Sequence, residues 1–384
     1  MSKVGIIFGV AFIIFVYGGS NFYIGRKIFQ WIKLLYPNIN GTVYAVIYAF
    51  FALSLFMAIL PLPTTIKGIM SWIGSYWMGI FVYLLIFFIL VDLVIFLGSI
   101  VKIIPTPIPK SVNFYAGLAA ILLTVSFVSY GIYNANQIKH VSYDIQTKTT
   151  TLPTGMKIVL VSDMHLGAVN SEKRLESIVK NINKLEPDIV CITGDIFNDD
   201  YNDLQNPEEA IALLKSITAT YGVYGSLGNH DSGKTFDKMM NFLERSNIKL
   251  LNDEYVMIEK RLILFGRVDP SPIGGFGELK RKDITRLTDS LDDNLPIVVM
   301  DHTPTKLEQY GEKIDLVLSG HTHKGQIFPG NLITNALFDV DYGQYQKDAA
   351  SPHVIVTSGV GTWGMPMRVG SNSEIVSIYL HNKQ

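Results

Sequence analysis

Hydrophobic residues are distributed in two different ways along the chain. Before about residue 135 they form long continuous stretches, and after it they occur in short runs separated by polar residues. Four of the long stretches reach the length of about 20 apolar residues that a helix needs to cross a bilayer. They cover residues 4–24, 42–60, 76–100 and 112–133. The pattern therefore predicts a membrane region over residues 1–135 with four transmembrane helices.

The rest of the chain has the periodicity of a globular α/β domain. Runs typical of strands cover residues 157–162, 189–193, 222–227, 255–258, 262–268, 297–300, 316–318, 354–356 and 375–379. Between them, residues 171–184, 207–218 and 236–245 have apolar positions at helical spacing. We expect a two-sheet sandwich flanked by helices over residues 153–384. A linker at residues 136–152 would join it to the membrane region.

The composition agrees with this division. Of the 384 residues, 48% are hydrophobic and 17% are charged, whereas about a quarter of the residues in soluble domains are charged. The formal net charge is −1 and no stripe of basic residues is present, which disfavours nucleic acid as a partner. We expect an integral, multi-pass protein of the cell membrane, in contact with membrane lipids.

Positively charged residues in the loops indicate an orientation. The loops after the first and third stretches contain more of them, namely Arg26, Lys27, Lys33, Lys102 and Lys110. The segments on the opposite side of the membrane contain Lys3, Lys67 and Lys139. The positive-inside rule places these two loops in the cytoplasm, and the globular domain outside it. One acid, Asp92, lies inside the third stretch; it is either functional or bonded to hydroxyl groups of neighbouring helices.

Polar clusters with metal-binding side chains follow the strand-like runs. The first is Asp163-x-His165, whose two side chains would project to the same side if the strand continued through them. The others are Gly194-Asp195, Gly228-Asn229-His230-Asp231, Asp301-His302 and Gly320-His321-Thr322-His323. The carboxyl ends of buried strands are where α/β sheets bind ligands. Imidazole, carboxylate and amide donors without a thiolate suit two divalent metals such as Mn, Fe or Zn.

These motifs, in this order, resemble the signature of the calcineurin-like metallophosphoesterase superfamily, and the apolar amino-terminal stretches resemble its transmembrane branch. The resemblance covers residues 157–380 and implies a four-layer α/β/β/α sandwich after the membrane region. It also implies a dinuclear metal site with seven ligands. These are Asp163, His165 and His323 for the first metal, Asp195 as the bridge, and Asn229, His302 and His321 for the second.

The resemblance assigns a reaction to this site. Two cations share the charge of a phosphoryl group and activate a bridging water or hydroxide, which attacks phosphorus in line. His230 would lie over the substrate phosphate as an electrostatic stabiliser or as the general acid for the leaving oxygen. A histidine that titrates near neutral pH suits that protonation.

Three positions leave alternatives open. Many relatives carry an acid three residues after the bridging aspartate, and it orients the catalytic histidine; here that residue is Asn198, so either Asn198 or the neighbouring Asp199 orients His230. Lys324 replaces a glycine common in this branch, and it either reaches a substrate phosphate or is a solvated loop lysine. Arg368 resembles a Pro-x-Arg arginine of relatives. It either contacts the substrate or forms a salt bridge with Glu374.

The function that we expect is hydrolysis of a phosphoester or pyrophosphate bond by a membrane-anchored enzyme. Four spans exceed what a soluble nucleotide would require, so the substrate should be lipid-linked or close to the membrane. Since some relatives cleave lipid-linked nucleotide sugars, a UDP-diacylglucosamine-type pyrophosphatase is one specific expectation. The alternative is a non-catalytic metal-binding membrane scaffold or sensor. A transporter is disfavoured because the apolar stretches carry few charges.

Overall fold

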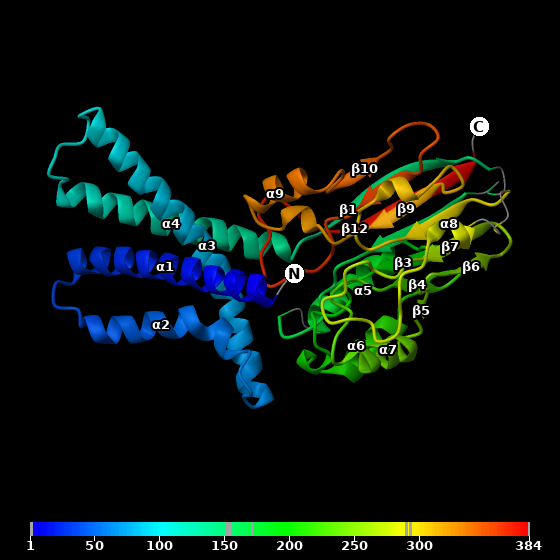
Figure 1. Cartoon of the computed structure of the whole chain (residues 1–384), viewed down its shortest axis with the longest axis horizontal. Helices are drawn as coiled ribbons and strands as arrows, with labels where there is room; N and C mark the ends of the chain where they lie inside the picture. Colours follow the sequence, from blue (N-terminus) through cyan, green and yellow to red (C-terminus); the bar gives the residue numbers. More distant parts are fainter. Residues whose placement is uncertain are drawn as a thin grey trace. The chain divides into compact units, whose positions relative to one another are not determined.

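The computed structural model of the chain describes residues 3–149, 152, 155–169, 172–288, 291 and 294–382. The chain divides into two compact units, Met1–Tyr130 and Gly131–Gln384 (Figure 1). The first unit is helical and the second is the α/β domain.

The helical unit contains α1 (Lys3–Leu35), α2 (Gly41–Met57), α3 (Thr64–Ile100) and most of α4 (Lys110–Ala135). Within the described part of the chain, α3 and α4 are long and apolar enough to cross a membrane, whereas α2 is apolar but has 17 residues. The structure corrects one assignment: α1 continues to Leu35, so Arg26, Lys27 and Lys33 lie on a helix and not in a loop.

Asp92 is paired inside the helical unit. Its carboxylate accepts a hydrogen bond of 2.7 Å from the hydroxyl of Tyr23 and forms an ion pair with Lys27, both on α1. Bonding to a hydroxyl on a neighbouring helix is the structural alternative that the sequence left open. The ion pair also explains how an acid is accommodated in the third apolar stretch.

The linker predicted over residues 136–152 is wrong. Residues Ile138–Thr147 form strand β1, which pairs in parallel with β12 (Ser373–Asn382) along its whole length. The strand lies at the edge of its sheet and half of its side chains face solvent, so its hydrophobic signal is weak. The last turn of α4 also belongs to the domain, because Asn134 donates hydrogen bonds to the carbonyls of Arg368 and Ser371.

The domain is built on two mixed sheets of six strands each among the described residues. The first has the order β1-β12-β2-β3-β4-β5, and its remaining strands are β2 (Met156–Val161), β3 (Ile189–Thr193), β4 (Val223–Ser226) and β5 (Lys249–Leu250). The second has the order β10-β11-β9-β8-β7-β6. Its strands are β6 (Glu254–Ile258), β7 (Leu262–Gly266), β8 (Ile297–Met300), β9 (Leu316–Ser319), β10 (Gly343–Tyr345) and β11 (His353–Val356).

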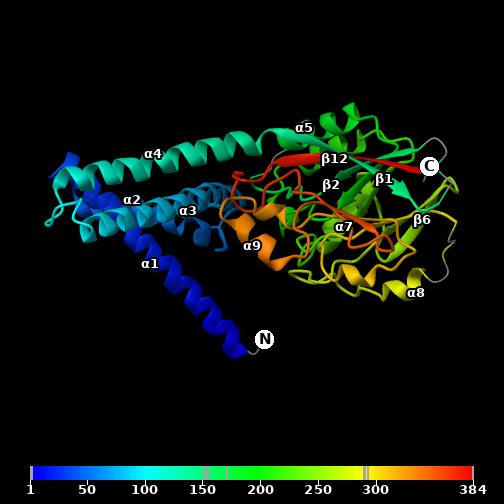
Figure 2. The same ribbon diagram turned by 90° about the horizontal axis from the view of Figure 1, so that it is seen from above.

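The alternation along β2 shows how the layers form. Ile158 and Leu160 belong to the core between the two sheets, while Val159 and Val161 pack toward the outer helices α5 (Glu172–Lys184), α6 (Pro207–Lys215) and α7 (Phe236–Arg245). On the other side, β7, β8 and β9 pack against α8 (Ile284–Thr288). The two-sheet sandwich with outer helices is therefore confirmed (Figures 1 and 2). Parallel strands covered on both faces are apolar throughout, as these are.

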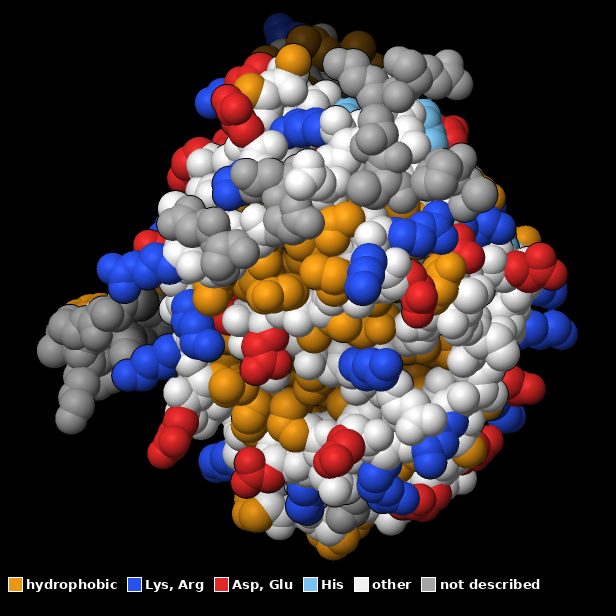
Figure 3. Space-filling view, turned by 90° about the vertical axis from the view of Figure 1, so that its right-hand side faces the viewer, with side chains coloured by type: hydrophobic (Ala, Val, Ile, Leu, Met, Phe, Trp, Pro, Cys, Tyr) orange, Lys and Arg blue, Asp and Glu red, His pale blue; other side chains and the backbone are white. Residues whose placement is uncertain are grey.

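Four short elements of the domain were not predicted. They are β5, β10, α8 and a helix α9 (Gly330–Leu337). Each has eight residues or fewer, too short for a periodic pattern to stand out. On the face shown in Figure 3, lysine and arginine side chains are interspersed with acidic ones around apolar side chains, so both signs of charge are mixed there.

Candidate metal centre

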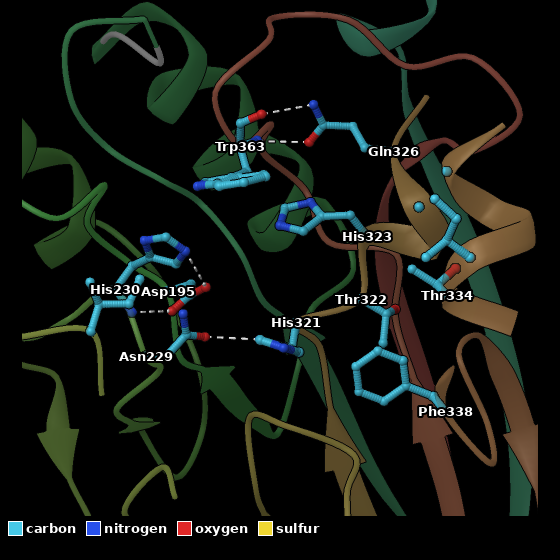
Figure 4. A pocket seen from close by; sticks show the side chains of 14 residues that line it. Asp195, Asn229, His230, His321, Thr322, His323, Gln326, Thr334, Phe338 and Trp363 are labelled. Atoms are coloured by element: carbon cyan, nitrogen blue, oxygen red, sulfur yellow. Dashed lines mark hydrogen bonds and ion pairs between the residues drawn. The ribbon is translucent and has the colours of Figure 1, made fainter. Parts of the chain in front are cut away.

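The predicted ligands lie just after the carboxyl ends of five parallel strands. Asp163 and His165 follow β2, Asp195 follows β3, and Asn229 follows β4 in the first sheet. In the second sheet, His302 follows β8, and His321 and His323 follow β9. All are buried except His321, which is partly exposed. The two sheets thus bring side chains from distant parts of the chain to one edge of the sandwich (Figure 4).

Two groups of potential ligand atoms are formed among the described residues. The first group consists of Asp163, His165 and His323. Each offers one potential ligand atom, and the three atoms lie within 4.8 Å of one another. The Nε2 atoms of the two histidines are 3.1 Å apart, and Nε2 of His323 is 3.3 Å from Oδ1 of Asp163. Two imidazole nitrogens and a carboxylate oxygen therefore converge on one point. Atoms of these kinds are ligands of Mn, Fe and Zn.

The second group consists of Asp195, His302 and His321. Nε2 of His302 lies 3.1 Å from Oδ2 of Asp195, and the Asn229 side-chain oxygen lies 2.9 Å from Nδ1 of His321. The same Oδ2 of Asp195 is 3.7 Å from Nε2 of His165 in the first group. Asp195 therefore lies between the two groups.

The backbone at the ligands is unusual. Five of them have a positive φ: Asp163 (57°), His165 (46°), Asp195 (51°), His321 (70°) and His323 (50°). Residues other than glycine rarely adopt this conformation, and it costs free energy that the surrounding structure must supply. Asp163 and His165 consequently converge through left-handed turns after β2 and not through strand alternation, which was the reason we gave from the sequence.

A glycine makes the close approach at Asp195 feasible. A Cβ atom placed on Gly228 would collide with the side chain and the backbone nitrogen of Asp195. Any other residue there would displace the carboxylate or the β4 turn. This is the physical reason for the glycine in the Gly228-Asn229-His230-Asp231 motif.

The protonation states suit metal binding. Burial lowers the pKa of His165 to about 3 and that of His321 to about 4, and it lowers the pKa of His323 well below its usual value. Metals bind neutral imidazole. At His302, burial also acts to lower the pKa, but the charge of Asp195 outweighs it and raises the pKa well above the usual value. The carboxylate of Asp195, 3.1 Å from Nε2 of His302, thus favours the positively charged form of this imidazole, and a bound cation would take the place of that charge.

His230 is oriented by Asp199. Nδ1 of His230 lies 2.6 Å from Oδ1 of Asp199, and its Nε2 lies 4.0 Å from Oδ2 of Asp195. The side-chain oxygen of Asn198 is buried and has no hydrogen-bond partner among the described residues. The prediction that included Asn198 is therefore corrected in favour of Asp199. A positive φ of 68° at Asp199 aims its side chain at the histidine, and residue spacing does not reveal such a turn.

Lys324 and Arg368 both contact groups of the protein. The ammonium group of Lys324 lies 4.1 Å from the centre of the Tyr342 ring, and its role in substrate binding stays a prediction. The side chain of Arg368 is fully buried, with Nη2 3.3 Å from Nδ1 of His323. The substrate-binding prediction for Arg368 is therefore corrected.

Arg368 also does not form the alternative salt bridge with Glu374, as far as the described residues show. The Glu374 carboxylate instead accepts hydrogen bonds from Tyr342 and Thr357. Nη2 of Arg368 donates to the carbonyl oxygens of Ser358 and Gly361, each at 2.7 Å. Arg368 thus lies behind His323 and connects it to the glycine-rich loop.

A cavity of about 470 Å³ opens at the metal groups. Its polar lining includes Asp195, Asn229, His230, His321 and His323, and its apolar lining is formed by Ile273, Ile333, Phe338 and Trp363 (Figure 4). An organic group attached to a phosphate would therefore meet an apolar surface next to the metal groups.

Trp363 is a site residue that we did not predict. Its ring lies 5.9 Å from that of His230. The Gln326 side chain accepts a hydrogen bond of 2.7 Å from the Trp363 backbone nitrogen and donates one of 2.9 Å to its carbonyl. An aromatic residue close to the glycine-rich segment around Gly361 was the available signal.

Comparisons with known proteins agree with this site. Residues 156–325 match the family described as calcineurin-like phosphoesterase. An uncharacterized metallophosphoesterase of Aquifex aeolicus is 31% identical over 242 residues, which cover 63% of this chain and 91% of the relative. One of Campylobacter jejuni is 31% identical over 273 residues, 70% of each chain. A transmembrane protein with metallophosphoesterase domain of Danio rerio is 29% identical over 286 residues, covering 70% of this chain and 63% of the relative.

The chain belongs to the calcineurin-like metallophosphoesterase family. The enzyme class predicted from the motifs, a metal-dependent phosphoric ester hydrolase, is therefore confirmed. The family uses a dinuclear site for divalent metals. The residues present fit such a pair of ions, since two adjacent buried groups offer imidazole nitrogen and carboxylate oxygen atoms without a thiolate.

Proposed function

We propose that this protein is a membrane-anchored phosphoesterase that hydrolyses a phosphoester or pyrophosphate bond in a lipid-linked or membrane-proximal substrate. The observation that carries the proposal is the composition of the cavity. One part of its lining consists of metal-binding side chains, and another part is apolar. A phosphate attached to an apolar or amphipathic group would match both parts. A UDP-diacylglucosamine-type pyrophosphate is one substrate of this kind.

The seven side chains have distinct roles in this proposal. The first ion would be held by Asp163, His165 and His323. The second ion would be held by Asn229, His302 and His321. Asp195 would contribute to the binding of both ions. When bound, the two ions would supply positive charge for the phosphoryl oxygens and lower the pKa of a coordinated water. The donor atoms suit Mn, Fe or Zn as the bound metal.

His230 would protonate the leaving oxygen. It lines the cavity, and its Nδ1 is hydrogen-bonded to Asp199, which leaves Nε2 for the substrate. Burial acts to lower the pKa of His230, but the hydrogen bond to Asp199 and the charge of Asp195 outweigh burial and raise it. A general acid must carry its proton at the working pH, so this shift supports the role.

The membrane anchor would consist of four transmembrane helices with the catalytic domain outside the cytoplasm. Its support is the apolar composition of α3 and α4 and the relatives named as transmembrane proteins. The orientation rests on Lys102 and Lys110, which flank the connection between those helices. Protease treatment of sealed, right-side-out vesicles should cleave the domain. Protection in those vesicles with cleavage after lysis would reverse the orientation.

The enzymatic part is tested on the purified full-length protein with added Mn²⁺, Fe²⁺ or Zn²⁺. We expect metal-dependent release of phosphate or nucleotide from at least one member of a panel of aryl phosphates, phosphodiesters and lipid-linked pyrophosphates. Asp195→Asn should lose both metal and turnover, whereas His230→Ala should retain metal and lose turnover. A scaffold would be indifferent to His230→Ala. Absence of metal-dependent hydrolysis across the panel would refute the proposed function.

A further inference from the structure

Helix α9 presents an apolar face to the exterior of the domain. Leu332, Ile333 and Leu337 are 60%, 61% and 74% exposed, and Phe328, just before the helix, is 44% exposed. The three helical residues, with the exposed Ala336, fall at i, i+1, i+4 and i+5, which places them on one side of a helix. None of the eight residues of α9 is charged. An uncharged face of this kind on a soluble surface marks an interaction site.

The opposite side of α9 is attached to the domain. The Thr334 hydroxyl donates a hydrogen bond of 2.8 Å to Asp341, and the Gly330 nitrogen donates one of 2.7 Å to the carbonyl of Ile327. A Cβ on Gly330 would collide with the carbonyl of Gly325, so the start of the helix lies directly against the turn after His323. The polar side of α9 is thus fixed, and its apolar side faces outward.

The apolar face continues into the cavity of the metal centre. Ile333 belongs to both the exposed face and the cavity lining. Phe338, which follows the helix, also lines the cavity, and its ring lies 5.9 Å from the ring of His321 (Figure 4). A molecule in contact with α9 would therefore have direct access to the metal groups.

The same face begins close to the last turn of α4. The Phe328 nitrogen donates a hydrogen bond of 2.7 Å to the carbonyl of Val369, and the nitrogen of the preceding Arg368 donates one of 2.9 Å to the carbonyl of Gly131. All four residues belong to the second compact unit. α4 is one of the helices apolar enough to cross a membrane. The segment that leads into α9 is therefore linked, through Val369 and Arg368, to the last turn of α4.

We propose that α9 and Phe328 contact the surface of the lipid bilayer, with Leu332, Ile333 and Leu337 at the boundary between headgroups and acyl chains. Contact with a bilayer explains why the face carries no charge and why it starts beside the end of α4. Trp363, 50% exposed at the cavity, has the amphipathic ring that is enriched at this boundary. The cavity then opens at the level where lipid phosphates lie. This inference rests on the proposed membrane anchor and narrows the substrate to one presented in the bilayer.

The test uses single-cysteine variants of the full-length protein, one molecule per lipid nanodisc. The only native cysteine, Cys191, is fully buried, and burial raises the pKa of its thiol, so it does not react with labels. Leu332→Cys and Leu337→Cys receive an environment-sensitive fluorophore. Asn335→Cys, on the polar side of the same helix, and Ser177→Cys, exposed on α5, are the matched controls.

We expect blue-shifted emission at positions 332 and 337, with loss of intensity when lipids with a nitroxide near the headgroup are included. Position 335 should show a smaller effect and position 177 none. Emission at 332 and 337 equal to that at 177 would overturn the inference. Blue-shifted emission without nitroxide quenching would overturn it as well, because it would mean that protein covers the face.

A double variant, Leu332→Glu with Leu337→Glu, separates this inference from the proposed function. It should hydrolyse a water-soluble aryl phosphate at the wild-type rate but lose activity toward a substrate embedded in the nanodisc. Equal loss with both substrates would contradict a role in lipid contact. If the wild-type protein hydrolyses neither, the proposed function fails, while the quenching pattern still decides the position of α9.

Discussion

Replacing Arg368 by methionine tests how the first metal group is held in place. The guanidinium group is fully buried, donates to the carbonyls of Ser358 and Gly361, and lies 3.3 Å from Nδ1 of His323. Methionine has a similar length and fills much of the same space, but it donates no hydrogen bonds. The substitution therefore removes the bonds while leaving most of the packing.

The magnitude follows from the groups left behind. Among the hydrogen bonds of the described residues, the carbonyl oxygens of Ser358 and Gly361 receive none except from Arg368. Leaving one buried group unpaired costs about 1–3 kcal/mol, so two cost about 2–6 kcal/mol. For a domain of this size, 1 kcal/mol corresponds to about 2–4 °C. A loss of about 2–6 kcal/mol would therefore lower the melting temperature by about 4–24 °C.

Thermal unfolding and bound metal are measured together on the purified full-length protein. Arg368→Met should lower the melting temperature and the Mn²⁺ content, since His323 loses its support. Arg174→Met is the matched control, because Arg174 donates to the carbonyl of Val360 in the same loop without contacting a ligand. It should lower the melting temperature but keep the metal. Wild-type stability and metal content in Arg368→Met would refute this account.

Three further outcomes follow from the geometry of the site. Asp199→Asn should lower kcat/KM by up to about 10²- to 10⁴-fold, the usual contribution of a general acid, at unchanged metal content, because His230 loses its charged partner. Unchanged kcat/KM would contradict this. Because the charge of Asp195 raises the pKa of His302, Mn²⁺ uptake should displace a proton from this side chain, and Mn²⁺ affinity should fall as pH falls. Calorimetry in two buffers detects the proton release, and its absence would count against this account. Gly359→Ala should lower the metal content and reduce the free energy of unfolding by about 1–3 kcal/mol. The reason is that φ at this position is 78° and the new Cβ would lie 2.6 Å from the Cβ of Asp163. Full metal occupancy in this variant would be the contrary result.

The sequence predicted most of the two-sheet architecture because buried parallel strands are apolar on both faces. The expected bounds of β3 and β8 coincide with the observed ones. The strand β1 was missed because an edge strand with one exposed face resembles a polar connection. The choice between Asn198 and Asp199 stayed open for a different reason. Which of two adjacent side chains reaches His230 depends on a left-handed φ at Asp199, and no pattern of residue types encodes that angle.

The prediction for Arg368 failed for a reason that concerns the division of the chain. Asn134, placed by sequence in the membrane region, donates hydrogen bonds of 3.1 and 2.8 Å to the carbonyls of Arg368 and Ser371. Arg368 in turn lies against His323. Two contacts thus link the last turn of α4 to a ligand of the first metal group. Asn134 directly follows the fourth apolar stretch and was therefore counted with the membrane region, yet its amide holds the segment that carries Arg368. The boundary between the helical unit and the α/β domain therefore follows hydrogen bonding to the segment of residues 368–371, and not the end of the apolar stretch.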